Sequence, residues 1–206
     1  MNRLRYLLAQ FLLLLAYPAP ATATTPPPPT AKAVFAGGCF WGVDAVFKHV
    51  KGVITVVSGY AGGVAATAQY PTVSSGTTGH AESVEVTYDP SQVSYRRLLE
   101  VFFAVAHDPT QLNRQGPDIG SQYRSAIFYL NEDQRKAAAA YIAELAHEGT
   151  FQKPIVTQVV PLAGFYPAEA YHQNYLAHHM TQAYIVINDL PKLRALEQRF
   201  PELYRP

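Results

Sequence analysis

The chain has 206 residues, with 16 Lys and Arg against 15 Asp and Glu, and 49% of its residues are hydrophobic. This near-neutral balance offers no basis for binding nucleic acid or an anionic membrane surface. The sequence holds one cysteine, Cys39, so it contains no pair for a disulfide. The length fits a single domain with its own hydrophobic core.

Residues 1–23 have the pattern of a secretory signal peptide. Arg3 and Arg5 precede an apolar stretch from Leu7 to Ala16, and Ala21-Thr22-Ala23 offers small residues for cleavage. The apolar stretch is much shorter than the ~20 residues that cross a bilayer, which disfavours the alternative of an uncleaved anchor. We therefore expect a periplasmic or secreted product that is free of the membrane after cleavage.

Residues 24–32 are predicted to be a Pro-rich linker, because four consecutive prolines favour a stiff, extended chain. Residues 33–206 are predicted to form a single catalytic domain. Without the two signal arginines the mature chain, residues 24–206, has a net charge of −1, and we expect a monomer.

Strands and helices are predicted along this domain from hydrophobic periodicity and turn residues. Strands are expected at 32–36, 53–60, 81–88, 123–130 and 155–160, and helices at 40–50, 94–106, 131–149 and 168–180. Residues 61–79 and 107–122 are expected to be long loops, and 189–206 a surface segment.

This order predicts an α+β fold, a ferredoxin-like α/β sandwich in which helices pack on a mixed sheet, plus a C-terminal extension. A doubly wound parallel sheet is the alternative. It is disfavoured because the strands at 53–60 and 81–88 follow each other without a helix between them.

Cys39 lies between the first strand and the first helix, within Gly37-Gly38-Cys39-Phe40-Trp41-Gly42. The dipole and free N–H groups at a helix N-terminus lower a thiol pKa, so this position predicts a reactive thiolate. The alternative is a small buried hydrophobic residue at a tight turn. A lone cysteine in an oxidising compartment favours a functional thiol.

The two long loops are expected to reach the end of the sheet where Cys39 lies. They bring Tyr70, Glu82, Asp118 and Tyr123 into consideration. Each has a structural alternative. Tyr70 could anchor its loop and Glu82 could be a solvated charge. Asp118 could be a turn residue and Tyr123 a core aromatic.

Together with Cys39, these segments resemble the type A peptide methionine sulfoxide reductases. The resemblance covers most of the predicted domain and rests on four blocks in the family's order: Gly38-Cys39-Phe40-Trp41-Gly42, Thr78-Gly79-His80-Ala81-Glu82, Gly120-Ser121-Gln122-Tyr123-Arg124-Ser125 and Phe165-Tyr166-Pro167-Ala168-Glu169-Ala170-Tyr171-His172-Gln173.

The resemblance implies reduction of methionine S-sulfoxide, free or in oxidised proteins, with Cys39 as nucleophile. A sulfoxide oxygen leaves poorly, so it needs a proton in the transition state, and Glu82 can supply one if an apolar site keeps it protonated. We expect Tyr70 and Tyr123 to hold the oxygen. The product would be methionine and a Cys39 sulfenic acid.

Further site residues follow from the same resemblance. Phe40 and Trp41 would hold the substrate's methyl group, since sulfur packs well beside aromatic rings. Asp118 would be a hydrogen-bonding partner in the site, although Gly116-Pro117-Asp118 departs from the usual loop. His172 would bind substrate, with a structural histidine as the alternative.

Many family members resolve the sulfenic acid with a second cysteine, but Ser74 stands where some of them have one. We therefore expect an external thiol reductant, either a thioredoxin-like protein or a small-molecule thiol. No metal or organic cofactor is expected. A metal site at His172, His178 and His179 is disfavoured because adjacent histidines on a helix point apart.

Two other classes of function stay open at this point. A cysteine hydrolase or acyl transferase would pair Cys39 with one of seven histidines, but the chain has no local signature of such enzymes. A non-catalytic binding module could use the aromatic residues to recognise an oxidised or apolar side chain.

Overall fold

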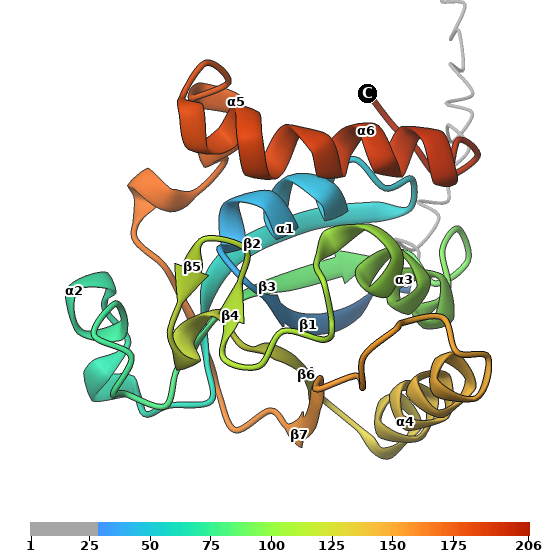
Figure 1. The fold of residues 1–206 in the computed structure, drawn as a ribbon, viewed down its shortest axis with the longest axis horizontal. Helices are drawn as coiled ribbons and strands as arrows, with labels where there is room; N and C mark the ends of the chain where they lie inside the picture. The colour runs from blue at the N-terminus through green and yellow to red at the C-terminus, as the bar shows by residue number, and fades with distance from the viewer. Residues whose placement is uncertain (1–28) are drawn as a thin grey trace, which may run out of the picture.

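The computed structural model describes residues 29–206 (Figure 1). The predicted signal peptide and residues 24–28 of the predicted linker lie outside this range. Strands in chain order are β1 (Ala31–Gly37), β2 (Val53–Ala61), β3 (Ala81–Tyr88), β4 (Arg114–Gln115), β5 (Asp118–Ile119), β6 (Ser125–Tyr129), β7 (Gln158–Pro161) and β8 (Phe165–Pro167). The α-helices are α1 (Phe40–Lys48), α2 (Tyr70–Val73), α3 (Tyr95–Val101), α4 (Glu132–His147), α5 (Tyr175–His178) and α6 (Leu190–Arg199).

The main sheet has the strand order β7-β6-β1-β3-β2-β8. Its four central strands pair antiparallel, with β3 lying between β1 and β2, as two split β-α-β units require. At the edges, β7 runs parallel to β6 and β8 runs antiparallel to β2. The α+β, ferredoxin-like prediction with a mixed sheet is confirmed.

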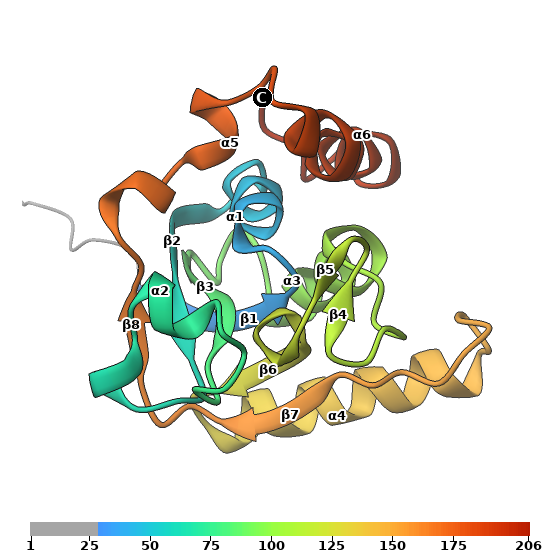
Figure 2. The ribbon, with the colours of Figure 1, turned by 60° about the vertical axis from the view of Figure 1, so that its left-hand side comes forward.

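The principal core lies between the sheet and the helices that cover one of its faces (Figure 2). Phe35 of β1 stacks on Phe47 of α1 at 5.1 Å and on Phe102 at 4.9 Å, measured between ring centroids. A smaller cluster of mostly alanine and valine side chains covers the other face. Packing against this core holds the N-terminal end of α1 beside the ends of β1 and β3.

The segment expected to lie loosely on the surface, 189–206, instead contains α6, which lies along α1 (Figures 1 and 2). Its Leu196 is fully buried in the principal core. The expectation at 189–206 was incomplete because Leu196 is the one fully buried residue of α6, and a single apolar position gives a weak periodic signal.

The helix predicted at 168–180 is wrong. The structure has a 3₁₀ turn at Ala170–His172 and then the short helix α5. Asn174 separates them with φ +56°, a left-handed conformation that asparagine tolerates better than most residues. The two long loops also contain local structure, namely α2 and the β4–β5 hairpin, and β8 follows the strand predicted to be last. Within residues 29–206, none of the helices has both the length and the apolar character needed to span a bilayer.

Candidate active site

Cys39 is the residue that precedes the first turn of α1, and it is 8% exposed. Gly38 makes the turn from β1 with φ +90°, where a Cβ atom would lie 2.5 Å from the Gln115 side chain. The glycine therefore allows both the left-handed backbone and the close approach of the β4–β5 hairpin. The sequence placed Cys39 correctly between strand and helix.

Glu82 of β3 lies against the same helix end. Its Oε2 accepts the backbone N–H of Phe40 at 3.1 Å, and the Cys39 side chain lies close enough to influence its pKa. Burial, with the charge of Asp118 adding to it, raises the pKa of Glu82 to about 8, although the Phe40 N–H and the Cys39 thiol lower it. Glu82 is therefore mostly protonated at neutral pH and can donate a proton.

The Cys39 thiol is less acidic than its position at a helix N-terminus predicts. Burial raises its pKa well above the ordinary value, and the charges of Glu82 and Asp189 raise it further. The nearby Trp41 backbone N–H and the charge of Lys192 act in the opposite direction. The expectation of a resting thiolate is corrected: desolvation outweighs the helix terminus, and the thiol carries its proton.

Tyr70 in α2 and Tyr123 in the 3₁₀ turn before β6 are both partly buried near this pair. Burial and the charge of Glu82 raise the pKa of each phenol. Within residues 29–206 neither hydroxyl hydrogen-bonds Glu82, so both hydroxyls can donate to a substrate. The acidity of Glu82 is set mainly by desolvation, as the sequence interpretation has it.

Asp118 of β5 is held by a residue that the sequence interpretation missed. The Tyr184 hydroxyl donates to Asp118 Oδ2, and the Tyr184 ring meets the Trp41 ring edge-on at 6.0 Å. Burial raises the pKa of Tyr184, and the hydrogen bond to Asp118 raises it further. No local pattern marks Tyr184, because its partner is 66 residues earlier in the chain.

Gly42, the last residue of the cysteine block, also has a structural explanation. A Cβ atom at Gly42 would lie 2.1 Å from Asp189 Oδ1 and 2.7 Å from Lys192 Nζ. These two side chains form an ion pair at 3.1 Å, and Asp189 is fully buried. Gly42 therefore lets an ion pair from the C-terminal segment pack against the first turn of α1.

Aromatic rings form one wall of the site. Phe40 is 1% exposed and packs 5.9 Å from Tyr60, while Trp41 stacks on Tyr175 at 3.6 Å. His172 lies behind these rings, where its Nδ1 accepts the indole N–H of Trp41 at 3.1 Å. The structure brings all the predicted site residues to one end of the sheet, with His172 in contact with the aromatic wall.

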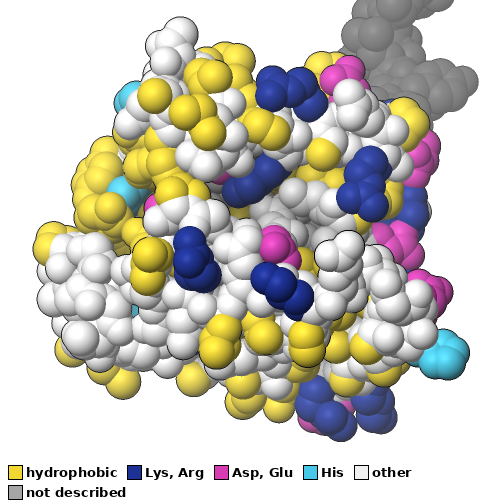
Figure 3. All heavy atoms as spheres, viewed as in Figure 1, with side chains coloured by type: hydrophobic (Ala, Val, Ile, Leu, Met, Phe, Trp, Pro, Cys, Tyr) yellow, Lys and Arg dark blue, Asp and Glu magenta, His cyan; other side chains and the backbone are white. Residues whose placement is uncertain are grey.

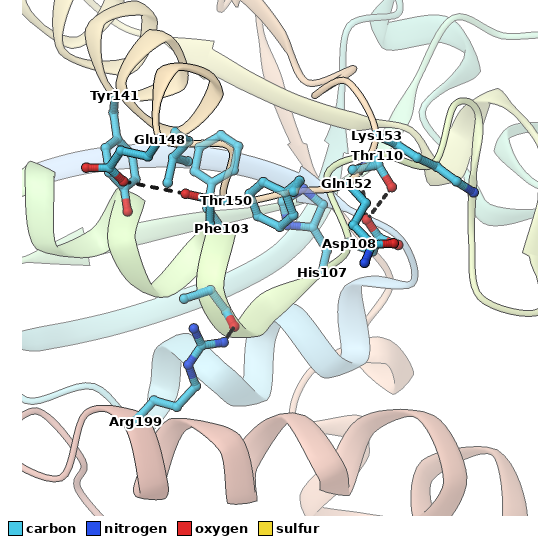
Figure 4. Close-up of a pocket in the computed structure, with 13 residues that line it drawn as sticks. Phe103, His107, Asp108, Thr110, Tyr141, Glu148, Thr150, Gln152, Lys153 and Arg199 are labelled. Atoms are coloured by element: carbon cyan, nitrogen blue, oxygen red, sulfur yellow. Dashed lines mark hydrogen bonds between the residues drawn. The ribbon is translucent and has the colours of Figure 1, made fainter.

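A separate cavity of about 610 Å³ lies between α4, the turn after α3 and the loop that follows α4 (Figure 4). Phe103, Tyr141 and Arg199 are among its lining residues, and none of the predicted site residues is. His107 also lines the cavity. Both of its ring nitrogens have hydrogen-bond partners, Nδ1 with Phe102 O and Nε2 with Ser125 Oγ. The cavity is thus distinct from the site at Cys39.

Comparison with known proteins identifies the arrangement. The family model described as "Peptide methionine sulfoxide reductase" matches residues 31–203. The chain belongs to the peptide methionine sulfoxide reductase family. It is an oxidoreductase that acts on peptide methionine sulfoxide.

Curated relatives of this reductase family agree over most of the chain. The chain is 58% identical over 172 residues to peptide methionine sulfoxide reductase MsrA 2 of Mesorhizobium japonicum, which covers 84% of this chain and 88% of the relative. It is 53% identical over 173 residues to MsrA 2 of Synechocystis sp.. This match covers 84% of this chain and 81% of the relative.

Solved structures of reductases agree on the fold. Mxr1 of Saccharomyces cerevisiae in its reduced form superimposes with a TM-score of 0.68 at 32% identity, covering 74% of this chain and 87% of that protein. Methionine sulfoxide reductase A of Corynebacterium diphtheriae gives a TM-score of 0.66 at 36% identity. The superposition covers 76% of this chain and 78% of that protein.

Proposed function

We propose that the chain reduces methionine S-sulfoxide by attack of the Cys39 sulfur on the sulfoxide sulfur, with Glu82 as proton donor. The observation that carries this proposal is the buried pair of Cys39 and Glu82 at the N-terminus of α1, where Glu82 accepts the backbone N–H of Phe40, the residue after Cys39. A carboxyl group that keeps its proton at neutral pH is the acid that a poor oxygen leaving group needs.

The proton balance of this step is closed within the pair. As the Cys39 sulfur bonds to the substrate sulfur, Glu82 gives its proton to the sulfoxide oxygen, and the thiol proton passes to Glu82. The oxygen then moves to Cys39 as the substrate S–O bond and the new bond between the two sulfur atoms break. Methionine leaves, Cys39 is a sulfenic acid, and Glu82 is protonated again.

Tyr70 and Tyr123 support this step by donating hydrogen bonds to the sulfoxide oxygen, since neither hydroxyl is committed to Glu82. Phe40 and Trp41 hold the methyl group in the aromatic wall. With the oxygen and the methyl group fixed at separate places, only one epimer presents its sulfur to Cys39. This supports selectivity for one epimer, and the family resemblance implies that it is the S epimer.

The surroundings of the site suit methionine sulfoxide within a polypeptide. Hydrophobic side chains gather over the α5 end of the face in Figure 3. Tyr171, Met180 and Ile187 in this part of the chain are 58%, 56% and 69% exposed. Exposed apolar side chains beside a reactive site favour contact with the apolar residues of a substrate chain.

The sulfenic acid needs a thiol from outside, because the sequence has one cysteine. A thioredoxin-like protein or a small-molecule thiol would attack the Cys39 sulfur and release water, and a second thiol would free the enzyme as a disulfide forms. We propose that this occurs in the periplasm or outside the cell, as the signal-peptide pattern indicates.

The experiment compares the two epimers of N-acetylmethionine sulfoxide with dithiothreitol as reductant. We expect turnover of the S epimer alone, no turnover by Cys39→Ser, and a rate lowered by about 10²–10⁴-fold in Glu82→Gln. Without dithiothreitol, one equivalent of methionine should form per protein, followed by a stop.

Equal rates on both epimers would contradict the proposed pocket. Full activity in Cys39→Ser would contradict the nucleophile. Hydrolysis of an ester by Cys39, with no turnover of sulfoxide, would favour the cysteine hydrolase class instead.

A further inference from the structure

The hydrogen bond between Trp41 and His172 fixes the state of the histidine. An indole N–H can only donate, so His172 Nδ1 must be an unprotonated acceptor at 3.1 Å. The proton of the neutral ring is then on Nε2. Burial lowers the pKa of His172, although the charge of Glu169 raises it, so the neutral ring is favoured.

Glu169 lies on the Nε2 side of His172. Its Oε2 is 4.0 Å from Nε2 and accepts the Tyr60 hydroxyl at 2.8 Å. Its Oε1 accepts the backbone N–H of Tyr70 at 2.8 Å, at the start of α2. One carboxylate thereby faces the histidine that holds Trp41 and also fixes the helix that carries Tyr70.

This segment is attached to the sheet through Gln173. Its side-chain amide accepts the Ser58 N–H at 3.0 Å and donates to Ser58 O at 2.9 Å, so it forms two hydrogen bonds with the backbone of β2. His172 and Glu169 are therefore held against the sheet.

We propose that His172, which accepts the Trp41 N–H at Nδ1 and turns Nε2 toward Glu169, positions the Trp41 indole and so sets the width of the pocket for the substrate's methyl group. His172 is a positioning residue in this inference, which rests on the proposed function. It replaces the expectation that His172 binds substrate directly.

Direct contact with substrate is disfavoured by the surroundings of the ring. His172 is 2% exposed. Its ring lies 5.0 Å from Phe40, 4.6 Å from Tyr70 and 4.2 Å from Tyr171, measured between centroids. Within residues 29–206, Nε2 has no hydrogen-bond partner, and it faces a carboxylate.

The test uses three substitutions of His172 that differ in where they place a hydrogen-bond acceptor. In His172→Asn the amide oxygen would lie near the position of Nδ1, and in His172→Gln it would lie near that of Nε2. His172→Leu offers no acceptor. His147→Leu is the matched control, because His147 is exposed on α4.

Binding is measured in the unreactive Cys39→Ser background, so that it does not depend on turnover. Trp41 is the only tryptophan in the sequence, so intrinsic fluorescence reports directly on the site. The probes are N-acetylmethionine S-sulfoxide and its ethyl analogue. The methyl ligand should bind at least about tenfold better than the ethyl ligand.

For His172→Leu we expect a shifted Trp41 emission, methyl-ligand binding weakened by about three- to tenfold, and reduced discrimination against the ethyl ligand. His172→Asn should restore emission and discrimination, and His172→Gln should not. In protein that retains Cys39, His172→Leu should raise KM by a larger factor than it lowers kcat.

Two results would overturn the inference. Restoration by His172→Gln and not by His172→Asn would show a role for Nε2, as in direct binding. Unchanged emission and discrimination in His172→Leu would show that His172 does not position the indole. Thermal melting verifies that each variant folds, and a wild type that turns over no sulfoxide would instead contradict the proposed function.

Discussion

The buried side chains of Cys39 and Glu82 lie together at the start of α1, and burial raises the pKa of both. The resting site therefore holds two protons, one on each side chain. After the proposed reduction, the sulfenic acid and Glu82 again hold one proton each. The oxygen transfer needs no proton from solvent, which suits a pair that is shielded from it.

The rate of the first turnover should depend on pH through Glu82. Its pKa of about 8 predicts a rate that is flat below that value and falls about tenfold for each unit above it, as the acid loses its proton. Rapid-quench measurement of methionine formed without reductant isolates this step. Glu82→Gln should be slow and lack the decline, whereas a wild-type rate that rises through pH 9 would indicate that thiol ionisation limits the step.

The stability of the fold should also depend on Glu82, in a predictable direction. Its folded-state pKa of about 8 lies above the ordinary 4.5, so the folded protein holds the proton more tightly than the unfolded chain does. The free energy of unfolding should therefore fall by about 1.4 kcal/mol per unit as the pH rises from 4.5 to 8.

Urea unfolding at pH 5, 7 and 9 checks this prediction, with Glu82→Gln losing less stability over the range than wild type. Asp44→Asn is the comparison, because burial raises the Asp44 pKa only to about 6 and its effect should end at lower pH. Parallel curves for wild type and Glu82→Gln would contradict the raised pKa.

Gly42→Ala should destabilise the protein although alanine favours helices. The added methyl group would overlap Asp189 Oδ1, so we expect a loss of about 1–3 kcal/mol from overpacking. Urea unfolding measures this loss. In an Asp189→Ala background the same substitution should cost less, and additive effects would show that the two residues do not interact.

Leu196→Ala should be costly because Leu196 is fully buried on α6. A loss of about 2–5 kcal/mol is expected from the removed contacts and the resulting cavity. Leu112→Ala is the matched control, since Leu112 is 64% exposed, and it should change stability by less than about 0.5 kcal/mol. Equal effects of the two substitutions would mean that α6 is not part of the cooperative core.

The central sheet and the position of Cys39 were accessible from the sequence because their signals are local. The alternation of apolar and polar residues in β3 and the glycines around Cys39 are patterns that span only a few neighbouring residues. Once the strands are located, few topologies are allowed, and the strand order follows from them. The resemblance to known motifs added Glu82 and Tyr123, whose neighbourhoods are short and distinctive.

The remainder of the site depends on contacts between distant segments. Tyr184 reaches Asp118, and Asp189 reaches Gly42, with no pattern around any of them to predict the pairing. The acidity of Cys39 also escaped prediction, because burial depends on what finally packs over the thiol. The broken helix before α5 follows from the left-handed Asn174, a conformation that periodicity does not reveal.

The late position of Tyr184, Asp189 and α6 in the chain has a consequence for folding during synthesis. A growing chain that ends just before Tyr184 already contains every strand of the main sheet and all of α1. It still lacks the residues that flank the Cys39 thiol from the C-terminal side. The thiol lies early in the chain, but its enclosure is complete only once the C-terminal segment packs against α1.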